Sequence, residues 1–105
     1  MNNHLDKFYN MIGMGKRANL VRVGDYVCTE SIQKNTSSLI IVAEDASQNT
    51  RKKFTQKCEF YQVKCIVIGE KTNLGNAVGK EAAATLTVND EKFAAQLIKI
   101  IENIT

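Results

Sequence analysis

The sequence predicts an α/β protein, a three-layer α/β/α sandwich with a mixed sheet of about four strands. Three observations predict this fold. Short apolar runs rich in β-branched residues recur along the chain, most clearly at residues 39–43, and amphipathic segments lie between them. The 105 residues contain no proline that would interrupt the helices. A chain of this length fits one domain, residues 1–105, with a modest core.

The first half of the chain is expected to contain two helices and two strands. The first helix is predicted over residues 3–14, with Asn3 as its N-cap and the glycines at 13 and 15 as its end. A short strand follows at 20–23, then a second helix at 24–35 and a strand buried on both faces at 38–43. The residues predicted to face the core from the two helices are Leu5, Phe8, Ile12, Cys28 and Ile32.

The second half is expected to contain three helices and two strands. A capping box of Asp45 and Gln48 begins a helix over residues 46–61, and a second buried strand follows at 63–69. A short helix begins at Asn73 and ends at Gly79; after a last strand at 83–88, Asn89 or Asp90 caps the final helix. The predicted core residues of the three helices are Phe54, Cys58 and Tyr61; Leu74, Ala77 and Val78; and Phe93, Ala94, Leu97, Ile98 and Ile101.

Two glycine patterns imitate phosphate-binding loops without meeting their requirements. At residues 74–80, three residues instead of four separate the glycines, and Glu81 stands where a P-loop needs a hydroxyl for Mg²⁺. The pattern at residues 13–18 follows a predicted helix, whereas a dinucleotide fingerprint must follow a strand. The sequence therefore predicts no bound nucleotide and no cofactor.

Few residues are suited to catalysis or to metal binding. The three cysteines include no Cys-x-x-Cys pair, and His4 is the single histidine. Glu44 and Asp45 lack a partner for acid–base catalysis and suit a helix N-terminus better. The sequence predicts neither a metal site nor an enzyme. No apolar run approaches membrane length and no signal-peptide pattern is present, so we expect a cytoplasmic protein with no membrane partner and no small-molecule substrate.

The charge distribution is uneven although the net charge is only +3. Residues 47–64 contain five basic side chains and one carboxylate, whereas residues 81–105 contain two basic side chains and four carboxylates. A basic segment of this kind indicates a polyanionic partner. On charge alone, a solvated helix face explains it equally well.

Four segments together resemble a known family. They are residues 41–47, the pairs Lys52-Lys53 and Lys57-Cys58, residues 67–69, and residues 74–81. In residue types and spacing they resemble the L-seven-Ae family of ribosomal proteins, and within it a small bacterial branch of YlxQ type. The resemblance covers most of the chain. It implies an α/β/α sandwich that binds structured RNA, commonly kink-turns. The expected partner is rRNA or another kink-turn-like RNA, and some members of the family are components of the ribosome.

The resemblance also implies where RNA binds: the start of the second helix, the Ala-Glu-Asp turn, and the loop after the short helix. The start of the second helix offers free N–H groups, and a glycine there lets the RNA come close to the protein backbone. The basic groups expected to meet phosphates include Arg22. The implied site residues are Gly24, Asp25, Tyr26, Thr29, Glu44, Lys80, Glu81 and Ala82, with Lys16 and Arg17 on the rim.

One segment departs from the family. Relatives that bind kink-turns carry Gly-x-Asn-Glu-x-x-Lys at the second helix, where Asn and Glu contact guanines and Lys contacts a phosphate. Aligned on Gly24, this sequence has Tyr26, Val27 and Glu30 at those positions. Kink-turn specificity is therefore left open. The alternative function is a protein–protein adaptor on the same fold that has lost the RNA contacts and uses the Phe60-Tyr61 end or the Tyr26 edge.

Overall fold

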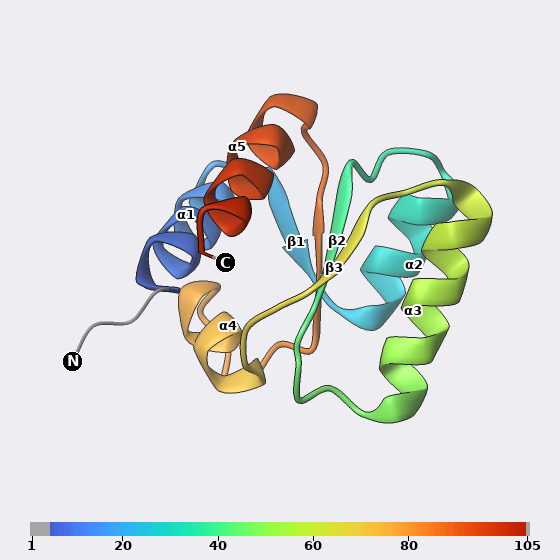
Figure 1. The fold of residues 1–105 in the computed structure, drawn as a ribbon, viewed down its shortest axis with the longest axis horizontal. Coiled ribbons are helices and arrows are strands. Elements are labelled where there is room, and N and C mark those ends of the chain that lie inside the picture. Colours follow the sequence, from blue (N-terminus) through green and yellow to red (C-terminus); the bar gives the residue numbers. More distant parts are fainter. Residues whose placement is uncertain (1–4, 105) are drawn as a thin grey trace.

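A computed structural model describes residues 5–104 and contains five helices and one four-stranded sheet (Figure 1). In chain order the elements are α1 (Asp6–Arg17), β1 (Val21–Val23), α2 (Asp25–Gln33), β2 (Leu39–Val42), α3 (Gln48–Tyr61), β3 (Cys65–Val67), α4 (Lys71–Ala77), β4 (Thr85–Val88) and α5 (Glu91–Glu102). None of the helices in the described range is long and apolar enough to span a bilayer.

The sheet is mixed, with strand order β1-β4-β2-β3. β2 and β3 are parallel, and β4 runs antiparallel to both of its neighbours. Helices α2 and α3 cover one face, and α1, α4 and α5 cover the other (Figure 1). The predicted three-layer sandwich is confirmed, and so is the prediction that residues 39–43, 63–69 and 83–88 contribute to one sheet.

The core lies on both faces of the two central strands. All four residues of β2 and all four of β4 are buried. The prediction that residues 63–69 form a second buried strand is wrong, because β3 is an edge strand with β2 as its single neighbour. Cys65 and Ile66 are half-buried, and Val67 is 38% exposed.

Helix α1 continues through the two glycines that were predicted to end it. A Cβ atom on Gly15 would lie 2.5 Å from the Phe93 ring and 2.6 Å from Val21, so this glycine allows α5 and β1 to approach. The helix ends two residues later, and Asn19 adopts a left-handed conformation with φ of 66°. The predicted cap, Asn3, lies outside the described residues.

The helix termini correct two predicted caps. The N-cap of α3 is Ser47, whose hydroxyl accepts a hydrogen bond from the Thr50 N–H, and the Asp45 carboxylate instead accepts one from the Lys71 N–H at 2.8 Å. Asn73 lies inside α4 and does not cap it. Two predictions are confirmed: the Asp90 carboxylate caps α5, and Gly79, at φ of 78°, follows the end of α4.

Most of the predicted core residues are buried. Leu5, Ala77 and Ile98 are half-buried against the core. The prediction for Tyr61 is wrong, because its side chain is 39% exposed although it was predicted to face the core together with Phe54 and Cys58. It is the last residue of α3, and its neighbour Phe60 is exposed as well.

Candidate RNA interface

Three loops meet at one edge of the sheet. Gly24 directly follows β1, Glu44 is the second residue after β2, and residues 80–83 lie in the loop before β4. The Gly24 N–H donates to the Thr85 carbonyl at 3.1 Å, and the Ala43 N–H donates to the Ala84 carbonyl at 2.9 Å. These ladder bonds bring together the three segments that the family resemblance implied.

The N-terminus of α2 is open at this edge. No side chain caps it, so the N–H groups of its first turn have neither a capping oxygen nor a partner within the helix. Gly24 precedes it with φ of 119° and ψ of 152°, and a Cβ atom there would meet nothing within 4 Å. Tyr26, in the first turn, is 76% exposed. A helix N-terminus with free N–H groups attracts anions such as phosphate.

A basic groove lies beside this helix. Its volume is about 300 Å³, and its lining residues are Lys16, Asn19, Val21, Arg22, Val23, Val27 and Lys80. It brings together three cations, and no carboxylate lines it. The side chains come from α1, the turn after it, β1, α2 and the loop between α4 and β4, which meet only in the folded protein. Such a groove has the charge and shape to hold a phosphate backbone.

The backbone around the groove is fixed by further hydrogen bonds. The Lys80 N–H donates to the Gly75 carbonyl at 2.8 Å, and the Glu44 N–H donates to the Gly69 carbonyl at 2.7 Å. The side chains of Glu44, Glu81 and Ala82 remain exposed. The exposed side chains of these loops are therefore attached to a backbone that hydrogen bonds hold in place.

Three of the predicted residues contribute less directly. Arg17 is exposed but does not line the groove. The Thr29 hydroxyl is buried and has no hydrogen-bond partner among the described residues. Asp25 forms an ion pair with Lys53 of α3, with 3.1 Å between Oδ1 and Nζ. Its carboxylate is thereby drawn toward α3.

Asn19 and Val27 were not predicted to belong to the interface. Arg22 was predicted to meet phosphate but was not among the implied site residues. Arg22 lies between two valines on β1 and is exposed. Alternation in the sequence indicated this orientation. Asn19 belongs to the groove because of its left-handed turn, which no local pattern fixes.

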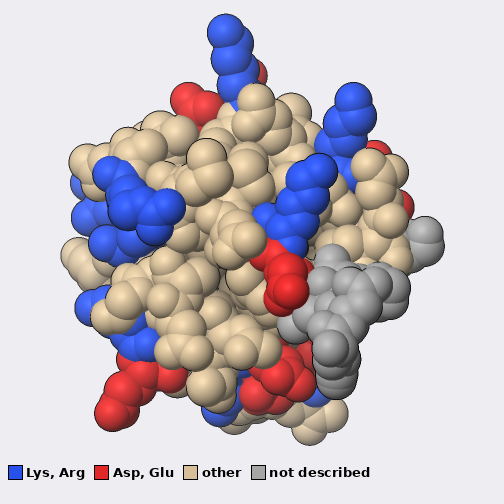
Figure 2. Space-filling view, turned by 90° about the vertical axis from the view of Figure 1, so that its left-hand side faces the viewer, with Lys and Arg blue, Asp and Glu red and all other residues tan. Residues whose placement is uncertain are grey.

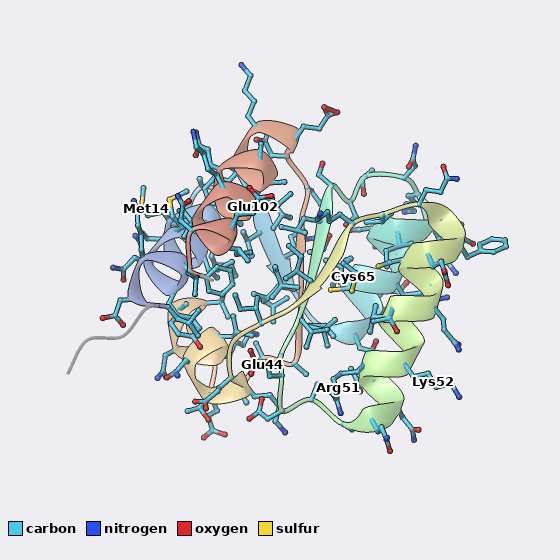
Figure 3. The ribbon with its side chains drawn as sticks, in the orientation of Figure 1. Met14, Glu44, Arg51, Lys52, Cys65 and Glu102 are labelled. Atoms are coloured by element: carbon cyan, nitrogen blue, oxygen red, sulfur yellow. The ribbon has the colours of Figure 1, made fainter. Side chains whose placement is uncertain are left out.

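Basic side chains are not confined to the groove. Figure 2 shows the face that lies on the left of Figure 1, where Lys and Arg side chains cluster toward one margin and others are spread over the top and the right. In Figure 3, Glu44 and Arg51 lie at the same end of the molecule, with Arg51 directed toward the sheet and Lys52 away from it. What distinguishes the groove is that its cations lie beside the uncapped N-terminus of α2.

Two of the three thiols, those of Cys28 and Cys58, are buried. No group of three His, Cys, Asp or Glu side chains within residues 5–104 is placed to hold a metal ion. Burial is the main cause that raises the pKa of Cys28 to about 12. A hydrogen bond between the Cys58 and Cys65 side chains, together with burial, raises the pKa of Cys58, and the same bond lowers the pKa of Cys65.

We expect Cys65 to react first with a thiol reagent. Because the pKa of Cys65 is lowered, a larger fraction of its side chain is thiolate at pH values below the ordinary thiol pKa of about 8.5. It is also the one cysteine of the three that is not buried. Reaction with Ellman's reagent in the folded protein should show one fast thiol, and Cys65→Ser should remove that phase. Fast reaction of Cys28 or Cys58 in the Cys65→Ser variant would contradict this prediction.

The sequence and the structure both match known proteins. The family described as "Ribosomal protein L7Ae/L30e/S12e/Gadd45 family" matches residues 6–98. The "RNA-binding protein YlxQ" of Bacillus subtilis (strain 168) is 33% identical over 96 residues, which are 91% of this chain and 96% of that protein. The protein of the same name from Enterococcus faecium is 29% identical over 96 residues, 91% of this chain and 92% of that protein.

Two solved structures share the fold. "The structure of a protein with unknown function from Bacillus halodurans C" has a TM-score of 0.87 at 30% identity and covers 91% of this chain and 97% of its own. The "Giardia lamblia 15.5kD RNA binding protein" has a TM-score of 0.80 over 100% of this chain and 93% of its own; at 19% identity it is evidence for the fold alone. Because the family match covers residues 6–98 of its 105 residues, the chain belongs to the ribosomal protein L7Ae/L30e/S12e/Gadd45 family.

Proposed function

We propose that this chain is a non-catalytic, cytoplasmic RNA-binding protein that holds structured RNA, such as rRNA, at the edge formed by Gly24, Glu44 and residues 80–83. The observation that carries the proposal is the basic groove beside the uncapped N-terminus of α2. Its three cations meet phosphates while the free N–H groups donate hydrogen bonds to a further phosphate or to an acceptor on a base edge. The names of the two YlxQ relatives agree with RNA as the ligand.

We further propose that binding depends on RNA shape more than on the guanines of a kink-turn. Val27 lines the groove where kink-turn relatives carry a hydrogen-bonding Glu, and an apolar side chain cannot accept from a guanine. Tyr26 offers an exposed ring on which an unpaired base can stack. Phosphate contacts and stacking hold RNA without reading its sequence.

Lys80→Ala tests this interface. The variant should bind a kink-turn RNA and a guanine-substituted copy more weakly by the same factor, because Lys80 contacts phosphate in both. The slope of log affinity against log salt should fall by about one. Fluorescence anisotropy over a salt series measures both effects. Lys92→Ala, which removes an exposed lysine of α5 outside the groove, is the matched control and should change neither.

The rival RNA surface is the basic helix α3. If Lys52→Glu with Lys53→Glu abolishes binding while Lys80→Ala leaves affinity and salt slope intact, the proposed interface is wrong. If the unmodified protein binds neither RNA at low salt, the protein–protein adaptor becomes the better function. The exposed Phe60 and Tyr61 rings are the observation that favours it.

A further inference from the structure

A second groove lies along α3. Its volume is about 550 Å³, and its lining residues are Lys53, Gln56, Lys57, Phe60 and Tyr61. None of these residues belongs to the interface proposed above. The groove combines basic, amide and aromatic side chains on one helix.

We propose that this groove binds a single-stranded RNA segment that continues from the structured RNA held at the sheet edge. The continuity rests on the proposed function, whereas the binding of single-stranded RNA by the groove does not. Lysines would contact the phosphates, and the aromatic rings would stack on bases.

The aromatic pair is placed for stacking and adds little to the core. Phe60 is 79% exposed and Tyr61 is 39% exposed, so both rings offer apolar surface to solvent. Their centroids are 5.0 Å apart at an interplanar angle of 77°, an edge-to-face contact that restrains both rings. Bases of any sequence stack on such rings, which is how single-stranded nucleic acid is held without sequence preference.

The charges in the groove favour a polyanion over an apolar protein segment. Lys53 and Lys57 line it, and no carboxylate does, although α3 also carries Glu59. Lys53 is paired with Asp25, and no ion pair holds Lys57 among the described residues. An apolar partner would have to desolvate the Lys57 ammonium without pairing it, which is costly. A phosphate would pair it instead.

The spacing of these side chains makes a continuous path. Positions 53, 56, 57 and 60 follow the helical repeat and lie on one side of α3. At 1.5 Å per residue they span about 10 Å. Lys53 lies at the near end, because its Nζ is 3.1 Å from the Asp25 carboxylate in the first turn of α2. A strand leaving the sheet edge would therefore meet Lys53 first, then Lys57, and then Phe60.

The test is the binding of a short fluorescent oligouridylate, which has no structure for the sheet edge to recognise. Phe60→Ala should weaken its binding about tenfold, the loss expected for one stacked base. Lys57→Ala should lower the salt slope by about 0.7, the value for one phosphate of a single strand. Lys52→Ala, on the same helix but outside the groove, should leave binding unchanged. Phe60 is mostly exposed, so its replacement should leave the circular dichroism spectrum intact.

A second arm separates this inference from the proposed function. Gly24→Val should lose the structured RNA and keep the oligouridylate. A single-stranded uridine tail on the structured RNA should strengthen binding by the unmodified protein but not by Phe60→Ala. Binding of single-stranded RNA by the groove is overturned if Phe60→Ala binds oligouridylate as well as the unmodified protein does, and a protein then becomes the better partner. If oligouridylate binds through Phe60 but the tail adds nothing, the continuity with the structured RNA is overturned.

Discussion

Gly75→Ala is expected to destabilise the protein by about 1–3 kcal/mol, the usual cost of overpacking a tightly packed site. A Cβ atom on Gly75 would lie 2.6 Å from both the N and the Cα atoms of Ala82 and 2.9 Å from its carbonyl carbon. These are backbone atoms, so no rotamer change relieves the contact, and α4 or the following loop must move. Urea denaturation followed by circular dichroism measures the loss as a lower midpoint.

The same substitution should weaken RNA binding, because Ala82 belongs to the proposed interface. Asn76→Ala is the matched control: it adds no atom, lies in the next position of α4, and replaces an exposed residue by a better helix former. Its midpoint should be unchanged or slightly higher. An unchanged midpoint for Gly75→Ala would mean that the loop adapts without cost, and the packing argument would be wrong.

Gly24→Val should cause the largest loss of RNA affinity of any single substitution at the sheet edge, more than tenfold. Residue 24 has φ of 119° and ψ of 152°, a region open almost solely to glycine, where another residue costs about 1–3 kcal/mol. Valine therefore rotates the backbone that leads into α2 or extends into the open space where the RNA would lie. Either change separates the RNA from the free N–H groups. Fluorescence anisotropy with structured RNA measures the loss.

The control for Gly24→Val must be equally destabilised elsewhere. Ile98→Ala removes a half-buried side chain of α5, on the face of the sheet opposite α2, and should leave RNA affinity unchanged while both variants are folded. If Gly24→Val keeps the affinity of the unmodified protein, the α2 N-terminus is not part of the interface.

The order of helices and strands was predictable because it depends on local periodicity, but the termini depend on distant contacts. Gly15 suggested a helix end, yet it is a point of close approach to Phe93, far along the chain. Similarly, Asp45 suggested an N-cap for the helix that follows it, yet its carboxylate binds the Lys71 N–H of α4. The residue type limits which contacts a side chain can make, but the packing of distant segments determines which of those contacts forms.

The candidate interface was predictable in its loops and not in its groove. Gly24, Glu44 and Lys80 came from the resemblance, and the fold brings their loops to one edge. The groove depends on the pairing of β1 with β4, because Arg22 lies on β1 and Lys80 lies in the loop that leads into β4. The pairing partner of a three-residue strand is not encoded in its own sequence, so this part could not be derived locally.

The missing cap of α2 cannot be supplied at position 24. An Asp or Ser N-cap accepts a hydrogen bond from an N–H group of the first turn and stabilises a helix only modestly relative to glycine. Residue 24 has φ of 119°, where any residue other than glycine costs about 1–3 kcal/mol. The same backbone conformation that leaves the N–H groups open thus excludes the residues that would cap them, and a screen for higher melting temperature should retain glycine at this position.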